Sequence, residues 1–209
     1  MMFACAKQED SSTETQDSSD AGNSGDSSDE VITEKVNGYI QKGPFVQGTE
    51  VTMRTLRYDL APTGQTYTGT IEDNSGSFVV RGTIRNRYAE LSADGYYFNE
   101  VSGALSTSKL TLQALVNLKN ASSVNVNLMT HLEKKRLEYP MDNGVSFSEA
   151  KSQAQSEIVK MFNIDNVTLG NSETLDISKS GDDNAVLLAI SVILQSNRTE
   201  AELTELLST

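Results

Sequence analysis

The hydrophobic pattern of this chain changes period near residue 120, and that change constrains the fold more than any other feature. Before it, short β-rich or alternating runs are separated by turn sequences that supply Gly, Pro, Asp or Asn. The runs are residues 36–41, 49–56, 67–72, 77–81, 88–93 and 109–118. Short strands at about ten-residue spacing are typical of a sandwich, so we predict an antiparallel β-sandwich over residues 31–120.

After residue 120 the apolar residues recur at helical spacing, which predicts a small all-α helical bundle over residues 121–209. Leu128 and Leu132 lie on a first helix that Pro140 and Gly144 close. Capping boxes at residues 146–149 and 199–202 predict the starts of a second and a last helix. The last helix runs almost to the end of the chain, so we expect this domain to be incomplete at its C-terminus. The predicted fold class is α+β with segregated domains.

A third helix is predicted over residues 183–196, with Asp182 or Asp183 as its N-cap. Residues 185–194 read AVLLAISVIL, which is apolar nearly all round a helix. A helix of that composition is normally buried between neighbours, because only burial removes all of its sides from water. The apolar stretch of ten residues is too short to cross a bilayer.

The negative charge of the chain is concentrated near its start. The formal net charge is −12, and residues 6–30 contain eight acidic residues, one basic residue and no Leu, Ile, Val, Phe, Tyr or Met. Such a segment cannot bury enough apolar surface to offset the entropy of ordering, so we predict a disordered, Ser-rich acidic tether. The excess of negative charge argues against nucleic acid as a partner.

The only cysteine of the chain precedes this segment. Phe3-Ala4-Cys5 resembles the lipobox of bacterial lipoproteins, in which a diacylglycerol is attached to the Cys thiol. The following Ala-Lys-Gln-Glu-Asp resembles the export signal of surface lipoproteins of the Bacteroides group. The resemblance implies lipidation of Cys5, membrane attachment through it and a surface-exposed outer-membrane location. The charged and apolar parts of a signal peptide do not precede Phe3, so we expect the natural start to lie upstream or to have been removed.

The strand region contains three further motifs in a fixed order. They are Val36-x-Gly38-x-Ile40 with Gly43-Pro44-Phe45-Val46, then Thr70-Ile71-x-Asp73-x-x-Gly76-x-Phe78, then Tyr88-x-x-Leu91-x-Ala93-x-Gly95-Tyr96. Together they resemble the carboxypeptidase-regulatory-like domains, which share a transthyretin-like (prealbumin-like) sandwich. Those domains are mainly structural or binding units without catalytic residues, so the resemblance implies architecture more than activity.

Few residues of the chain suggest chemistry. One Cys and one His exclude an internal disulfide and a Cys/His zinc site, and no P-loop or G-x-S-x-G motif is present. His131 is a candidate base, although a helix-surface or interface position explains it better. Residues 72–76 suggest a calcium loop and residues 182–184 a metal site, but a hairpin turn and a helix cap explain them better. We predict no cofactor and no metal.

Two clusters are the candidates for ligand contact. Arg85 and Arg87 belong to the one basic cluster, and Tyr96 and Tyr97 to the one aromatic cluster. Arginine favours an anionic or glycan ligand and aromatic rings favour a sugar, while a solvated strand face and core packing are the alternatives.

The predicted function is non-catalytic binding, adhesion or assembly at the cell surface, with a glycan or a protein as ligand. One alternative is an accessory module of a larger surface enzyme whose catalytic part lies outside this chain. A third and weaker interpretation is an enzyme within this chain.

Overall fold

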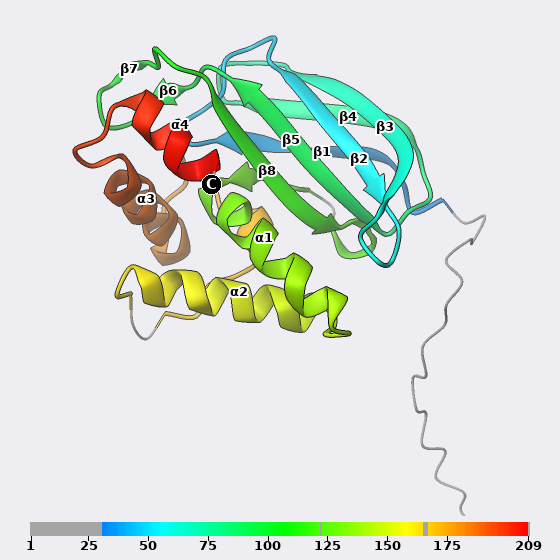
Figure 1. Cartoon of the computed structure of the whole chain (residues 1–209). Helices are drawn as coiled ribbons and strands as arrows, with labels where there is room; N and C mark the ends of the chain where they lie inside the picture. Colours follow the sequence, from blue (N-terminus) through cyan, green and yellow to red (C-terminus); the bar gives the residue numbers. More distant parts are fainter. Residues whose placement is uncertain (1–30, 122, 165–166, 209) are drawn as a thin grey trace, which may run out of the picture.

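A curved seven-stranded sheet forms the first half of the computed structural model, which describes residues 31–121, 123–164 and 167–208 (Figure 1). Its spatial order is β8-β5-β2-β3-β4-β1-β9. The strands are β1 (Thr33–Gln41), β2 (Glu50–Leu56), β3 (Pro62–Ile71), β4 (Ser77–Ile84), β5 (Tyr88–Gly95), β8 (Leu110–Asn117) and β9 (Val126–Asn127). A small separate sheet pairs β6 (Phe98–Asn99) with β7 (Ala104–Leu105). The predicted lipidation site Cys5 and the acidic segment 6–30 lie outside the described residues.

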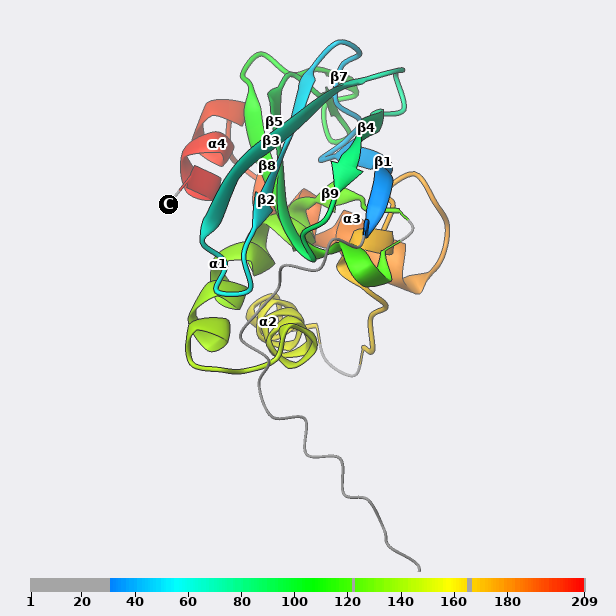
Figure 2. The same ribbon diagram turned by 90° about the vertical axis from the view of Figure 1, so that its right-hand side faces the viewer.

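The predicted strands are present, but they belong to one sheet. Hydrogen bonds connect the seven strands in a single order, and the sheet curls until β9 lies close to β8, so it is nearly closed (Figures 1 and 2). Every pairing in it is antiparallel except that of β9, which runs parallel to β1. A sandwich of two packed sheets is therefore not confirmed.

The approach of β9 to β1 depends on a glycine. A Cβ on Gly38 would lie 1.8 Å from the carbonyl oxygen of Val124, so any side chain there would push the two segments apart. Next to it, Asn125 accepts the Tyr39 backbone N–H at 3.0 Å and donates to the Leu175 carbonyl at 3.0 Å. Gly38 thus leaves space for β9 beside β1, and Asn125 bonds to β1 on one side and to the segment after η2 on the other.

One turn lies elsewhere than its sequence predicts. The Pro and Gly of residues 62–64 predict a turn there, but β3 begins at Pro62, which lies opposite Leu56. The chain reverses earlier, where the Arg57 N–H donates to the Ala61 carbonyl at 2.8 Å. Proline is tolerated at that position because it is the first residue of its strand.

Four α-helices follow the sheet. They are α1 (Leu128–Asp142), α2 (Phe147–Met161), α3 (Asp182–Gln195) and α4 (Glu200–Ser208), with short 3-10 helices η1 (Leu118–Asn120) and η2 (Ser172–Thr174). The capping boxes are confirmed, since Ser146 and Thr199 each exchange hydrogen bonds with the Glu three residues later.

Two predicted helix ends need correction. The first helix continues through Pro140 to Asp142, and Gly144, with a φ of 81° just after the C-cap Asn143, closes it as predicted. The N-cap of α3 is Gly181 rather than an aspartate, and Asp183 instead accepts the Gly170 backbone N–H at 2.9 Å. Both aspartates still lie in the first turn of α3, where their negative charge is stabilised by the positive end of the helix dipole.

The strands and helices share one hydrophobic core. Ile158 of α2, Ile190 of α3 and Leu203 of α4 belong to the same buried cluster as Ile40 and Leu112 of the sheet. Figures 1 and 2 show the helices below and beside the sheet, and α1 packs along β8. The α+β class is confirmed, whereas the segregation into two domains is not. None of the described helices has both the length and the apolar composition needed to cross a membrane.

Candidate functional site

The structure separates the four predicted ligand contacts. Arg85 and Arg87 lie in the loop before β5, and Tyr96 and Tyr97 follow the other end of that strand. A strand of this length spans roughly 23 Å, so the basic and aromatic clusters cannot contact one small ligand together.

Of the two tyrosines, only Tyr96 reaches the surface. Its exposed fraction is 43%, whereas that of Tyr97 is 1%. The Tyr97 ring stacks on Phe45 with centroids 6.0 Å apart, and burial raises the pKa of its hydroxyl well above the ordinary range. Core packing, the alternative to ligand contact, therefore accounts for Tyr97.

A buried lysine connects the sheet to α3 at this end of the molecule. Lys42 follows β1 and is fully buried, with its Nζ 2.5 Å from Glu100 Oε1. Ser191 of α3 donates a hydrogen bond to the same carboxylate, and Nζ lies 5.7 Å from the centroid of the Tyr97 ring. Burial lowers the pKa of Lys42 more than Glu100 raises it. Glu100 Oε2 and the Tyr97 hydroxyl are buried beside this pair without a hydrogen-bond partner. The contacts that the Glu100 carboxylate does make join the end of β1 to α3.

His131 is a structural link rather than an exposed base. Its Nδ1 accepts the Gln113 backbone N–H at 3.2 Å, and its Nε2 lies 3.0 Å from the Leu207 carbonyl oxygen. A carbonyl only accepts, so the proton of the neutral ring is on Nε2. Burial lowers the pKa of His131, although the bond to Leu207 opposes that shift. The side chain joins α1, β8 and α4 and leaves neither ring nitrogen to a substrate.

The carboxylate of Asp73, in the segment that suggested a calcium loop, is engaged within its own hairpin turn. Asp73 Oδ1 accepts the Ser75 backbone N–H at 2.8 Å and the Ser75 hydroxyl at 2.5 Å, and these bonds lower the pKa of Asp73 to about 2. Across the three described segments, no group of three or more His, Cys, Asp or Glu is placed to hold a metal ion.

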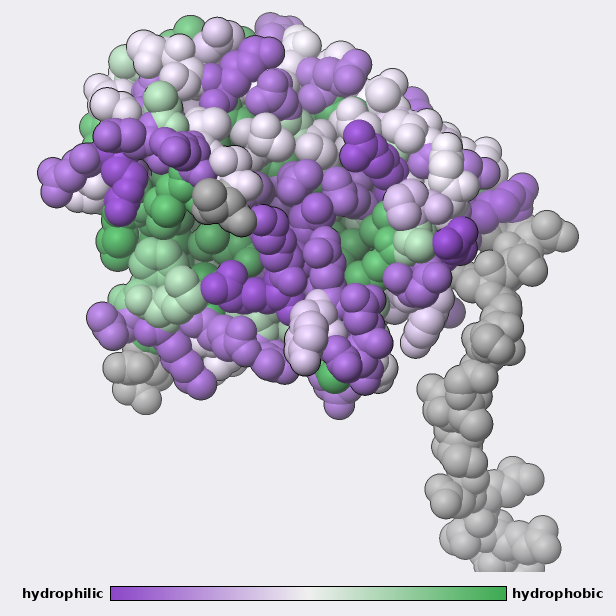
Figure 3. Space-filling model, viewed as in Figure 1, coloured by the Kyte–Doolittle hydropathy of each residue, from purple (hydrophilic) through white to green (hydrophobic). Residues whose placement is uncertain are grey.

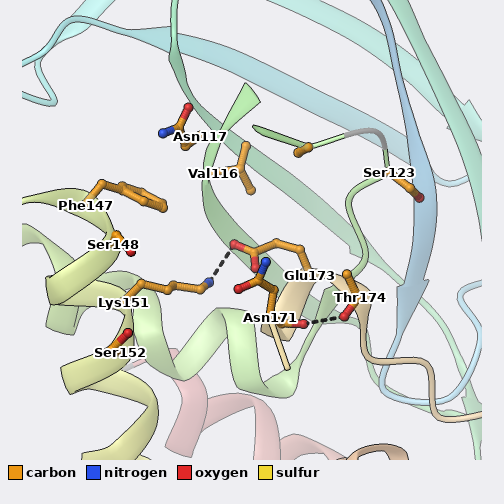
Figure 4. A pocket seen from close by; sticks show the side chains of 11 residues that line it. Val116, Asn117, Ser123, Phe147, Ser148, Lys151, Ser152, Asn171, Glu173 and Thr174 are labelled. Atoms are coloured by element: carbon orange, nitrogen blue, oxygen red, sulfur yellow. Dashed lines mark hydrogen bonds and ion pairs between the residues drawn. The ribbon is translucent and has the colours of Figure 1, made fainter. Parts of the chain in front are cut away.

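A pocket of about 230 Å³ opens between the start of α2, the end of β8 and the segment around η2 (Figure 4). The apolar part of its wall includes Val116 and Phe147. Its neutral polar lining consists of Asn117, Ser123, Ser148, Ser152, Asn171 and Thr174. Lys151 and Glu173 complete the pocket and point toward each other in Figure 4.

The base of this pocket is a buried ionic cluster. Lys151 Nζ lies 2.5 Å from Glu133 Oε2 of α1 and 2.6 Å from Glu173 Oε1 of η2. The Ser172 hydroxyl donates to the other oxygen of Glu133, and Gln155 donates to Ser172 at 3.1 Å. One ammonium thus joins α1, α2 and η2.

Burial and the neighbouring charges shift the pKa values of Lys151 and Glu133. Burial alone lowers the pKa of Lys151, but the two carboxylates outweigh burial and raise it, so the ammonium stays charged. Burial raises the pKa of Glu133 further than Lys151 and Ser172 lower it, and Glu173 adds to the rise. Two carboxylates face one ammonium, so the cluster has no positive charge to offer a ligand.

The aromatic wall is held rigidly. Phe147 stacks on Tyr88 with centroids 5.3 Å apart and planes at 22°. The capping box of Ser146 with Glu149 sets the start of α2, and hence the position of Phe147. That capping signal was readable in the sequence, but nothing in the pattern connected Phe147 with Asn117 or Glu173.

Comparison with known proteins adds no relative, since no family model, no curated protein and no solved structure matches the chain.

We predict that Lys151→Met strongly destabilises the fold at pH 7, by about 3–5 kcal/mol, because two buried carboxylates lose their counter-charge. The folded-state pKa of Glu133 is already raised, so the stability that its neutral form contributes is present at low pH and is lost as pH rises through that pKa. Without the ammonium the pKa of Glu133 rises further, so protonation of Glu133 should make the deficit of the variant shrink as the pH is lowered. Urea unfolding followed by circular dichroism measures it, with exposed Lys160→Met as control. A deficit independent of pH would contradict the prediction.

A second prediction concerns the only histidine. The pKa of His131 is lower in the folded state than in the unfolded state, where it is about 6.5. The neutral imidazole therefore contributes stability above pH 6.5, and this contribution is lost as the pH falls through the folded-state pKa. NMR should find the imidazole titrating below pH 6.5 in the folded protein. The loss of unfolding free energy on acidification should be smaller in His131→Gln than in the wild type. A folded-state midpoint at or above 6.5 would refute the prediction.

Proposed function

We propose that this protein is a non-catalytic binding protein held at the cell surface, and that the pocket beside α2 takes one sugar unit of a glycan. The observation that carries the proposal is the composition of the pocket. One rigid aromatic ring, Phe147, lies among amide and hydroxyl side chains above a base whose ammonium is already paired.

The charge of the base argues for a neutral ligand. A bound phosphate or carboxylate needs an excess of positive charge, but the single ammonium of Lys151 is flanked by the two carboxylates of Glu133 and Glu173, which repel an anion. A sugar instead presents hydroxyl groups, which donate to carboxylate and amide oxygens and accept from amide and hydroxyl donors. Asn171 and Glu173 provide such groups side by side, and Asn117 lies apart from them in the pocket lining (Figure 4). The Asn117 amide oxygen already accepts the Lys119 backbone N–H, so its amide NH₂ group is the donor.

The size and the aromatic wall favour a single ring-shaped group. The pocket volume of about 230 Å³ is below the ~300–1,000 Å³ of sites for drug-sized ligands. The face of an aromatic ring carries negative charge density, which attracts the C–H face of a sugar ring. Phe147 is already stacked on Tyr88, so its orientation costs no further entropy when a ligand binds.

The same cluster argues against catalysis at this place. A lysine acts as nucleophile or base only when it loses its proton, and two carboxylates raise the pKa of Lys151. The ammonium therefore serves to position Glu173 rather than to react.

The surface location rests on the sequence. Cys5 is the proposed lipidation site, and the acidic, Ser-rich segment of 25 residues from 6 to 30 is the proposed tether. A flexible chain of that length reaches at least roughly 25 Å, and its charge extends it further. A transthyretin-like sandwich remains our proposal for the fold family, because Ile40, Ile71 and Phe78 of the resembling motifs occupy buried positions in the sheet.

We predict that the full chain binds a subset of neutral glycans on an array. Phe147→Leu should weaken that binding about tenfold, since it keeps the apolar volume and removes the ring face. Tyr139→Leu is the control, because this tyrosine is 76% exposed and lies outside the pocket lining. Binding no better than background, or an equal loss in both variants, would count against the proposed ligand.

The anchor is tested separately. Expressed with an export signal in a lipoprotein-processing bacterium, the protein should incorporate labelled palmitate, and Cys5→Ala should abolish the label. Ser11→Ala should keep it, because it changes the same segment without removing the thiol. Label retained in Cys5→Ala would refute lipidation at this residue.

A further inference from the structure

Helix α3 has two apolar sides, and only one of them is covered. Leu187, Ile190 and Ser191 are buried against the core. On the opposite side Leu188, Val192 and Ile193 have exposed fractions of 39%, 42% and 48%, and Ala185 and Ala189 are also exposed. Figure 3 shows this surface as a hydrophobic area at the left, where Figure 1 places α3 and α4.

The uncovered side is a continuous seam. Residues 185, 188, 189, 192, 193 and 196 follow the i, i+3, i+4, i+7, i+8, i+11 spacing of one helix face. Residues 184–197 contain no charged side chain, so no charge along the helix has to be desolvated when protein covers it. An exposed apolar area of this kind on a folded protein marks an interaction site.

We propose that α3 packs against α3 of a second copy of this chain, in an antiparallel dimer with two-fold symmetry. A second α3 supplies the neighbour that a helix apolar on all sides requires. In a two-fold interface the same surface serves both copies, so the seam must match itself. Ala185 and Ala189 allow the two helix axes to approach closely, while Val192 and Ile193 of one copy fill the space beside the alanines of the other.

Charge complementarity at the helix ends selects the antiparallel orientation. Asp182 is exposed at the start of α3, and Arg198 is exposed just after its end. Antiparallel packing brings Asp182 of each copy to Arg198 of the other, whereas parallel packing opposes like charges at both ends. The helix dipoles favour the same orientation.

Neighbouring contacts determine which charged residues are expected to pair across the interface, and they favour Asp182 with Arg198. Arg198 Nη1 donates to the Leu194 carbonyl at 3.0 Å, which holds the guanidinium at the C-terminal end of α3, and Glu202 is the acidic group beside it on α4. Asp183 is engaged with Gly170, so Asp182 is the aspartate expected to pair across the interface.

The dimer is independent of the proposed glycan site. No residue that lines the pocket beside α2 belongs to α3. A dimer would therefore carry two accessible pockets, and failure of either proposal leaves the other standing.

Sedimentation equilibrium of the full chain, from about 1 µM to about 500 µM, tests the association. The wild type should be dimeric over the upper part of this range. Val192→Glu should raise the dissociation constant at least about a hundredfold, because it places a charge in the apolar seam. Tyr139→Glu, at an exposed position on α1, should leave the constant unchanged. A wild type that stays monomeric throughout, or a dimer indifferent to Val192→Glu, would overturn the proposal.

Charge reversal tests the orientation. Asp182→Arg alone and Arg198→Glu alone should each weaken the dimer about tenfold, because each places like charges at both ends of the interface. An equimolar mixture of the two variants should restore the wild-type constant. In the mixed antiparallel dimer, positions 182 and 198 again carry opposite charges at each end of the interface. Weakening without rescue in the mixture, or no weakening at all, would overturn antiparallel pairing.

Discussion

The arrangement of the helices depends on the buried ammonium of Lys151. Removing a charge from water costs several kcal/mol unless partners compensate it, and Lys151 finds its partners on two other segments, Glu133 of α1 and Glu173 of η2. An arrangement of the three segments that separates these groups would leave buried charges without partners and would be strongly disfavoured. Lys42 imposes the same condition at the other end, where Glu100 and Ser191 fix α3 against the sheet.

The surfaces near these two lysines differ in chemistry: one is the pocket beside Lys151, and the other is the outer side of α3. Around Lys151, two carboxylates flank one ammonium beside a small pocket, for which we propose a neutral sugar ligand. Around α3, Ser191 is buried on one side and the outer side is largely apolar, and for that side we propose a second copy of the chain. The two proposals therefore concern different parts of the chain.

Local signals predicted the local structure well. The alternating runs located six strands, and the capping boxes at Ser146 and Thr199 located two helix starts. Where local signals competed with tertiary contacts, prediction failed. Pro62 lies in a strand rather than in a turn, and Pro140 lies inside α1 rather than at its end. Asp183 accepts the Gly170 N–H instead of capping α3. The pocket could not be predicted, because its residues come from three separate segments spread between Val116 and Thr174.

By itself the sequence determined the change from strand to helical periodicity, the polar acidic segment after Cys5 and the unusual apolarity of residues 185–194, since each is a property of neighbouring residues. Only the tertiary structure decided that strands and helices share one core, that Tyr97 is buried while Tyr96 is exposed, and that one side of α3 remains uncovered. The physical reason is that burial and charge pairing are set by contacts between distant segments, such as Gly38 with Val124 and Lys151 with Glu133. Gly38 meets Val124 only when the segment before β9 packs beside β1, and Lys151 meets Glu133 only when α2 packs against α1.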